Sequence, residues 1–255
     1  MKKFFFLFIF LAVVFVCCFG VKNKSNKAMA TAAPDNSSGK AVAVLELFTS
    51  QGCSSCPPAD RLLGTLSGIP QVIALSFHVD YWDRFGWRDP FSSAAFTQRQ
   101  MSYATALHSD VYTPQLIVNG QTEMLGSDSN KIVQSIQKIL SQDPDASVTI
   151  QSAKNENGKA MVNFTIAGSI HKCAANVVIV EKQATTAVKA GENTGATITD
   201  YNVVRSFVSL NKITVGDNSA GITIPSSVDT KDLSVVVFLQ QKDNKIVAAA
   251  RQELQ

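Results

Sequence analysis

Residues 49–58 read TSQGCSSCPP, and the predicted fold follows from this stretch and its neighbours. Two of its residues, Cys53 and Cys56, are cysteines separated by a Ser-Ser pair, and an apolar run over residues 41–48 precedes it. The two prolines at its end suit only the first turn of a helix, where missing amide donors cost nothing. The stretch therefore indicates a strand that ends before the cysteine pair and a helix that begins after it.

Around this stretch, strand-like and helix-like patterns alternate. Short apolar runs predict strands, and apolar residues at helical spacing predict helices. The expected strands are residues 41–48, 72–79, 115–118 and 123–125, and the expected helices are 57–66, 92–108 and 127–140. A βαβ unit followed by a ββα unit is the thioredoxin order. We therefore predict an α/β thioredoxin-like domain over residues 40–142.

Beyond Pro144 the apolar period changes to two. About seven short strand patterns follow, with turn signals such as Asn157-Gly158 between neighbours and with no helical pattern. Strands of this kind without helices are typical of two packed sheets. The sequence thus predicts an all-β, sandwich-like domain over residues 143–255.

The N-terminus carries an export signal. Two lysines precede an apolar run that reaches Gly20, so residues 1–20 are a signal peptide or an N-terminal anchor. Lipid attachment at Cys17 or Cys18 is a further mode of membrane attachment. Residues 21–39 are small and polar and predict a flexible linker. We expect an extracytoplasmic protein, located in a periplasm, in the cell envelope or outside the cell.

The charge of the chain excludes one class of partner. The formal net charge is +3, and five lysines within the first 27 residues account for more than this excess. The folded part is close to neutral, whereas a nucleic-acid-binding domain needs a basic stripe. We expect no nucleic-acid partner and no cofactor. The expected partners are protein or small-molecule thiols and disulfides.

The cysteine pair has two interpretations. A thiol at a helix N-terminus faces unpaired amides and the positive end of the helix dipole, which favour the thiolate. Cys53 would then attack a substrate disulfide, and Cys56, one turn deeper, would resolve the mixed disulfide. The alternative is a structural disulfide in a non-enzymatic envelope protein. Cys173 leaves an odd number of cysteines beyond the linker.

Two further features complete the expected catalytic site. Glu46 lies in the apolar strand before the pair, and a buried carboxylate there would accept the proton of Cys56; otherwise it faces solvent at an edge. Thr113-Pro114 lies between a helix and a strand, where a cis-proline loop would pack against the cysteines and shape the substrate groove. The predicted catalytic residues are therefore Cys53, Cys56, Pro114, Thr113 and Glu46.

A rival site uses the same cysteines as metal ligands. His78 ends the predicted strand at residues 72–79, at the sheet edge where the cysteine helix starts. Two thiolates and an imidazole suit Cu(I) or Zn(II). The aromatic residues of the following segment, 81–91, either line a groove for a peptide or cover the sheet.

Several motifs resemble known proteins. The strand, the Cys-x-x-Cys pair at a helix start and the later Thr-Pro resemble the thioredoxin superfamily. More closely, the chain is similar to a secreted bacterial family, domain-of-unknown-function family 1223, in the segments ELFTSQGCSSCPPAD at 46–60, FHVDYWD at 77–83, VYTPQ at 111–115 and NVVR at 202–205. The resemblance implies the fold and an exported location. The function expected from the residues is that of a thiol-disulfide oxidoreductase.

Overall fold

The computed structural model describes residues 39–255, all of which belong to one compact unit. The predicted signal peptide or anchor (1–20), its Cys17 and Cys18, and all but the last residue of the predicted linker (21–39) lie outside the described residues. Within residues 39–255, none of the helices has both the length and the apolar character needed to cross a bilayer.

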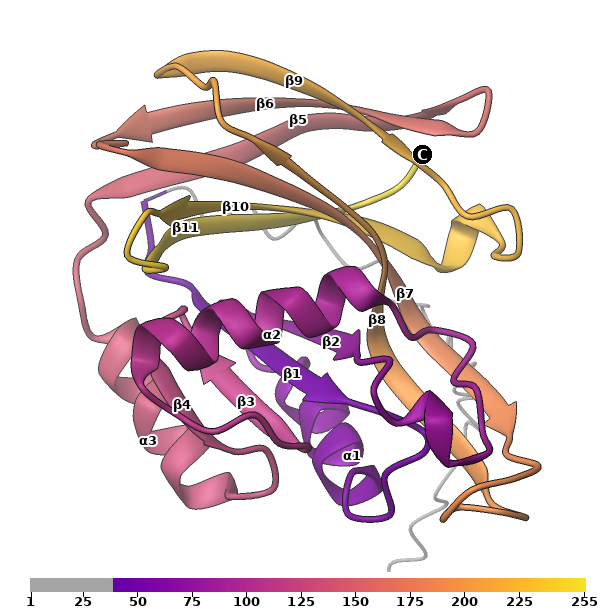
Figure 1. The fold of residues 1–255 in the computed structure, drawn as a ribbon. Coiled ribbons are helices and arrows are strands. Elements are labelled where there is room, and N and C mark those ends of the chain that lie inside the picture. The colour runs from indigo at the N-terminus through magenta and orange to yellow at the C-terminus, as the bar shows by residue number, and fades with distance from the viewer. Residues whose placement is uncertain (1–38) are drawn as a thin grey trace, which may run out of the picture. The chain divides into compact units, whose positions relative to one another are not determined.

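The elements follow one another as shown in Figure 1. The helices are α1 (Pro57–Leu66), α2 (Ala94–Leu107) and α3 (Ser129–Leu140), with short 3₁₀ turns η1 (Asp83–Phe85) and η2 (Thr230–Asp232). The strands of the first half are β1 (Ala43–Thr49), β2 (Val72–His78), β3 (Gln115–Val118) and β4 (Thr122–Leu125). Those of the second half are β5 (Ala146–Glu156), β6 (Lys159–Gly168), β7 (Cys173–Ala187), β8 (Thr197–Leu210), β9 (Gly216–Thr223), β10 (Leu233–Gln241) and β11 (Ile246–Glu253).

The predicted fold class is wrong. Eight strands form one mixed sheet in the order β11-β10-β7-β8-β2-β1-β3-β4, and this sheet takes strands from both predicted domains. Only β5, β6 and β9 form a separate sheet. The chain is therefore not an α/β thioredoxin-like domain followed by an all-β sandwich, although the individual strands and helices lie close to their predicted positions.

The physical reason lies in the burial of β7 and β10. Their centres are uninterrupted apolar runs, Val177–Val180 and Val235–Phe238, with no exposed side chain. Alternate residues of each run pack into two different cores, one on each face of the sheet. A strand covered on both faces reads as a continuous apolar run, whereas a sandwich strand alternates. These runs therefore place β7 and β10 in the middle of a covered sheet.

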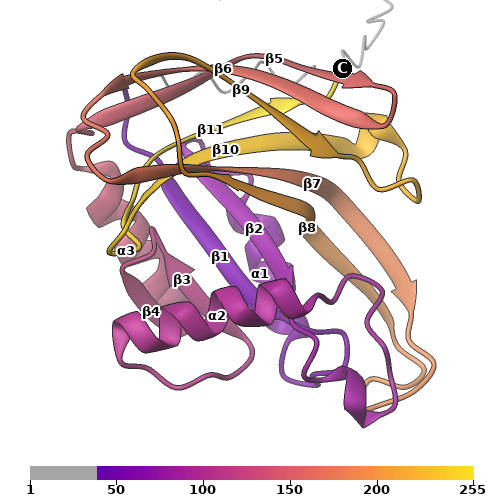
Figure 2. The ribbon, with the colours of Figure 1, turned by 45° about the horizontal axis from the view of Figure 1, so that its top comes forward.

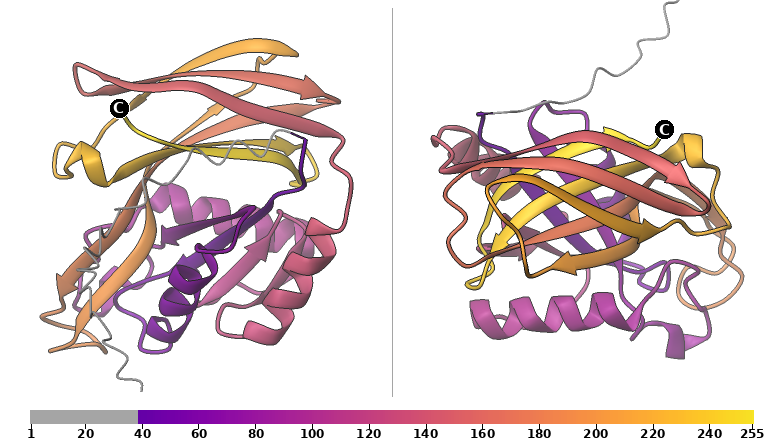
Figure 3. Two further views of the ribbon diagram at one scale, coloured as in Figure 1. Left: turned by 180° about the vertical axis from the view of Figure 1, so that it is seen from behind. Right: turned by 90° about the horizontal axis from the view of Figure 1, so that it is seen from above.

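Three layers cover the large sheet. The three-stranded sheet packs on one face of β7, β10 and β11, and Figure 3 shows it lying across them. Helix α2 packs on the opposite face through Phe96 and Tyr103. Helices α1 and α3 pack on the face of β1 that is turned away from α2. The sheet thus separates the environment of α1 from that of α2.

The junction between the two halves is the parallel pairing of β2 with β8, in which Ser76 lies opposite Val203. Figure 2 shows β8 running beside β2 and β1. Tyr201 of β8 lies over α1, because a Cβ atom on Gly64 would be 2.7 Å from its ring. β8 therefore packs against α1, and Asp200, the residue before Tyr201, reaches Gln51 just before the cysteine pair.

Candidate functional site

The cysteine pair lies where β1 passes into α1. Cys56 is the N-cap residue of α1, and its carbonyl oxygen accepts the amides of Ala59 (2.9 Å) and Asp60 (3.1 Å). Cys53 and Cys56 form a disulfide. Neither residue has any exposed surface, although Ser54 and Ser55 between them are exposed. The pair is thus oxidised and covered.

Thr113 and Pro114 lie beside the pair. The Thr113–Pro114 peptide bond is cis, and the Sγ of Cys53 is 3.9 Å from the carbonyl oxygen of Thr113. Above them, the indole Nε1 of Trp82 donates a hydrogen bond to Thr113 Oγ1 (2.8 Å). The structure thus brings together four of the five predicted catalytic residues: Cys53, Cys56, Thr113 and Pro114.

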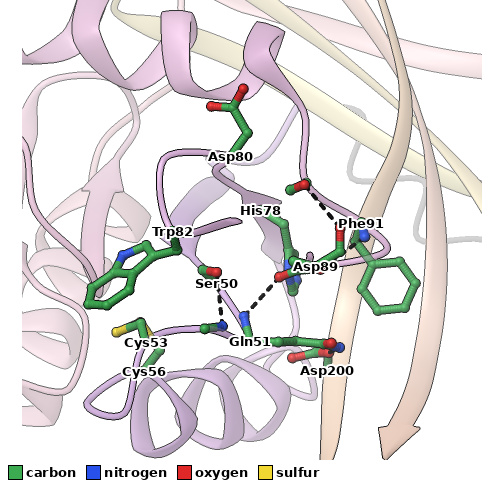
Figure 4. Close-up of polar contacts among 12 residues, drawn as sticks. Ser50, Gln51, Cys53, Cys56, His78, Asp80, Trp82, Asp89, Phe91 and Asp200 are labelled. Carbon is green, nitrogen blue, oxygen red and sulfur yellow. Dashed lines mark hydrogen bonds and ion pairs between the residues drawn. A yellow bond between two sulfur atoms is a disulfide. The ribbon is translucent and has the colours of Figure 1, made fainter. Parts of the chain in front are cut away.

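Near the disulfide lies a buried polar cluster that joins four segments: the loop after β1, the end of β2, the segment before α2, and β8 (Figure 4). Asp89 Oδ2 accepts hydrogen bonds from the backbone amide of Gln51 (2.8 Å) and from His78 Nδ1 (2.7 Å). Gln51 Nε2 donates to Asp200 Oδ2 of β8 (2.6 Å). All four residues are 1–2% exposed. Two carboxylates, those of Asp89 and Asp200, therefore hold Gln51, which precedes Cys53 by two positions.

Asp60 of α1 belongs to the same region. It follows Cys56 by four residues, so the two side chains lie on the same face of the helix, one turn apart. Asp60 is 4% exposed, and its Oδ1 has no hydrogen-bond partner among the described residues. Thr49 Oγ1, Ser76 Oγ and His78 Nε2, on the sheet face that α1 covers, are likewise buried and unpartnered. Polar groups of this kind usually mark buried water or a chemical role.

The charged groups of the cluster shift one another's pKa values. Burial, reinforced by the nearby Asp200, raises the pKa of Asp60 from 3.8 to about 7. Burial alone would lower the pKa of His78, but Asp89 and Asp200 raise it to about 9. Burial disfavours the charged form of Asp89, but the contact with His78 holds the pKa of Asp89 below its ordinary value. For Asp200, burial raises the pKa. Asp60 is therefore the carboxyl that changes charge near neutral pH.

Glu46 lies away from the pair. It has no exposed surface, but its carboxylate accepts hydrogen bonds from Arg99 Nε (2.7 Å) and from the hydroxyl of Tyr103. It shares a face of β1 with Val44 and Phe48, which pack under α2, whereas the neighbouring Leu45 packs against α1. The sheet thus stands between Glu46 and the cysteines, and this geometry does not support its predicted role as the proton acceptor.

The alternative metal site is not assembled. Within residues 39–255, no three histidine, cysteine, aspartate or glutamate side chains are grouped so as to hold a metal ion. His78 has one ring nitrogen on Asp89, and the two cysteines are bonded to each other. Cys173, the remaining cysteine of this part of the chain, is free and partly exposed.

Four members of the site were missed in the sequence: Gln51, Asp60, Asp89 and Asp200. The spacing of Asp60 from Cys56 was a usable signal, since residues i and i+4 share a helix face. Asp200 gave none, because its place depends on the pairing of β8 with β2.

The comparison with family models identifies one family. Residues 44–240 match the model of the family described as "Protein of unknown function (DUF1223)". No curated protein matches the chain. A crystal structure of protein AGR_C_4864 from Agrobacterium tumefaciens is similar, with 31% identity and a TM-score of 0.62 over 83% of this chain and 94% of that one. The family match covers more than half of the sequence, and the chain belongs to the DUF1223 family.

Proposed function

We propose that this protein is an extracytoplasmic thiol-disulfide oxidoreductase that uses Cys53 and Cys56. One observation carries the proposal: a Cys-Ser-Ser-Cys disulfide lies at the start of α1, one helical turn from the buried Asp60, whose Oδ1 has no hydrogen-bond partner among the described residues. The expected substrates are protein or small-molecule thiols and disulfides. The proposed likeness to the thioredoxin superfamily is limited to two elements of the site, the Cys-x-x-Cys pair and the Thr-Pro sequence.

The reaction balances as two exchange steps. In the reduced protein, the thiolate of Cys53, stabilised by the α1 N-terminus, attacks a substrate disulfide and releases one substrate thiolate. Cys56 then loses its proton and attacks the Sγ of Cys53, which restores the protein disulfide and releases the second thiolate. The protein dithiol is oxidised and the substrate disulfide is reduced. The same steps in reverse oxidise a substrate dithiol.

Asp60 takes the role of proton acceptor for Cys56. It lies one helical turn from Cys56, it is buried, and its pKa of about 7 suits a general base near neutral pH. Glu46 is engaged by Arg99 and Tyr103 on the other face of the sheet. The buried cluster thus supplies the base that the sequence prediction had placed at Glu46.

A structural disulfide is the second candidate function. The complete burial of both cysteines favours it, because catalytic cysteines usually keep partial exposure. In this alternative the pair only stabilises the turn between β1 and α1, and the protein is a non-enzymatic envelope protein. Reactivity separates the two candidates.

The test is a trapping experiment in a Cys173→Ser background, so that only the pair can react. The Cys56→Ser variant is expected to accumulate a mixed disulfide between Cys53 and a model disulfide, because its resolving thiol is gone. Mass spectrometry measures the adduct. The matched Cys53→Ser variant is expected to form far less.

The reduction potential provides the second measurement. Equilibration with a thiol buffer is expected to give a value above roughly −270 mV, in the range of disulfide oxidoreductases. A potential below about −300 mV, together with no adduct in Cys56→Ser, would establish the structural alternative.

A further inference from the structure

The burial of the disulfide raises the question of what covers it. A thiolate must reach the Sγ of Cys53 for exchange to begin, yet Cys53 has no exposed surface. The residues on either side of this sulfur differ in how firmly they are held. A comparison of their hydrogen bonds shows which of these residues is held least firmly.

Trp82 and Thr113 both lie close to Cys53. Figure 4 shows the indole of Trp82 next to the sulfurs. Its Nε1 is bonded to Thr113 Oγ1 (2.8 Å), and the carbonyl oxygen of the same threonine lies 3.9 Å from Cys53 Sγ. A Cβ atom on Gly52 would be 3.2 Å from the Cβ of Trp82, so the glycine makes room for the tryptophan. The side chains of Trp82 and Thr113 together form what we call the latch.

The opposite side of the cysteine loop is held more firmly. Asn193, in the turn between β7 and β8, donates hydrogen bonds from Nδ2 to the carbonyl oxygens of Gln51 (2.9 Å) and Cys53 (3.0 Å). Glu192 accepts the amide of Ser54 (3.1 Å). Three hydrogen bonds thus fix the backbone of this loop, whereas the indole of Trp82 has a single hydrogen bond.

Trp82 also lies at the surface. It is only partly buried, it precedes the short turn η1, and its ring lies against that of Phe85, which is 51% exposed, with the two centroids 5.4 Å apart. The indole packs at the margin of the core under α2, among its partly buried residues. An outward swing would give up this marginal contact and leave the fully buried residues of the core in place. The loop backbone and the buried cluster would stay in place.

We propose that the Trp82 indole, latched by Thr113, is a gate over Cys53 Sγ that opens to admit the attacking thiolate. The gate rests on the proposed exchange function and governs access to the same disulfide. Trp82 and Thr113 act by covering the sulfur, and neither takes part in proton or electron transfer.

The test measures how fast dithiothreitol reduces the disulfide of the oxidised protein, in the Cys173→Ser background. Thr113→Val keeps the shape of the side chain and removes one hydrogen bond, so the rate is expected to rise roughly 5- to 10-fold. Trp82→Ala removes the cover, and a larger increase is expected. Thr113→Val also serves as the second variant if Trp82→Ala fails to fold.

The matched control is the other tryptophan. Trp87 donates from Nε1 to Gln51 Oε1 (3.2 Å) and packs against Gly191 in the turn between β7 and β8. Trp87→Phe loses a similar hydrogen bond and is expected to leave the rate unchanged. With Cys173 restored, the alkylation rate of its thiol reports general loosening and should be equal in all variants.

Two results would overturn the gate. One is an unchanged reduction rate in both Thr113→Val and Trp82→Ala. The other is an equal acceleration in Trp87→Phe, which would show loosening rather than opening. Either result leaves the exchange function standing, since the mixed disulfide of Cys56→Ser tests that function independently. Conversely, faster reduction in the latch variants without any adduct in Cys56→Ser would uphold the cover and refute the oxidoreductase.

Discussion

Replacing Asp60 with asparagine is expected to slow the closure of the Cys53–Cys56 disulfide about 100-fold, the lower end of general-base effects. The introduced amide cannot accept the proton of Cys56, so Cys56 would attack only in the small fraction that ionises without help. Stopped-flow mixing of the reduced protein with a model disulfide, following release of the second thiol, measures the closure step. The first step, attack by Cys53, is expected to keep its rate.

Glu46→Gln is the matched control, because it neutralises the other buried carboxyl that lies close to the cysteine motif in sequence. The sheet separates Glu46 from the pair, and closure is expected to run at the wild-type rate in this variant. Slow closure in Glu46→Gln with normal closure in Asp60→Asn would reverse the assignment and return the acceptor role to Glu46.

The pH dependence gives the same variant a second signature. Asp60 accepts a proton only when ionised, so closure in the wild type is expected to accelerate as the pH rises through about 7. The Asp60→Asn protein should lack this inflection. A profile that keeps it would mean that another group, such as the Cys56 thiol itself, sets the inflection.

The free energy of unfolding of the wild type is expected to fall with rising pH, whereas the closure rate is expected to rise. The folded-state pKa of Asp60 lies above its unfolded value of 3.8, so its contribution to stability is complete below about pH 4 and is lost as the pH rises through about 7. A rise from 3.8 to about 7 corresponds to roughly 4 kcal/mol at most. Above pH 7, oxidised Asp60→Asn should therefore be more stable than the wild type.

Urea unfolding of the oxidised proteins at pH 4, 6 and 8 measures this difference. His78 adds a decline in the same direction, because its raised pKa gives stability that is full below 6.5 and lost as the pH rises through about 9. The wild type and Asp60→Asn both keep most of this decline, because Asp89 and Asp200, which raise the pKa of His78 more than Asp60 does, are present in both. A variant that is slower yet more stable marks Asp60 as a group kept for chemistry rather than for folding.

The local part of the site could be predicted from the sequence, because it depends on contacts close along the chain. Pro57 and Pro58 fix the start of α1, and the spacing of Cys53 and Cys56 allows their bond within one turn. The residues of the buried cluster could not, because Asp89 and Asp200 reach Gln51 from 38 and 149 positions away. Such contacts follow from how the strands pair rather than from a local pattern.

The fold prediction failed for a related reason. Period-two patterns place strands but do not tell which strands neighbour each other, so they gave no sign that β8 pairs with β2. The uninterrupted apolar run of β7 was the available signal, since it indicates burial on both faces. β8, which is more polar, pairs between β7 and β2 and gave no comparable signal.

Replacing Arg99 with methionine is expected to destabilise the fold by about 3–5 kcal/mol, the usual cost of breaking a buried ion pair on one side. Arg99 joins three elements: it binds Glu46 of β1, the hydroxyl of Tyr103 on its own helix α2, and the Oε1 of Gln240 on β10 (3.1 Å). Its guanidinium also lies over the ring of Phe207, with the Cζ atom 5.1 Å from the ring centroid. Without it the Glu46 carboxylate stays in a fully buried position with no opposite charge. Urea unfolding of the oxidised protein at pH 7 measures the loss.

The double variant Glu46→Leu, Arg99→Met separates the charge effect from lost packing. Removing both charges leaves no unpaired ion, so the double variant should be more stable than Arg99→Met alone, with the coupling given by a double-mutant cycle. Its closure rate, measured under conditions where it is fully folded, should equal that of the wild type. Equal stability of the single and double variants would mean that Arg99 acts through packing across β1, α2 and β10. Slow closure in the folded double variant would instead connect this pair to the cysteines through the sheet, and Asp60 would then share its role.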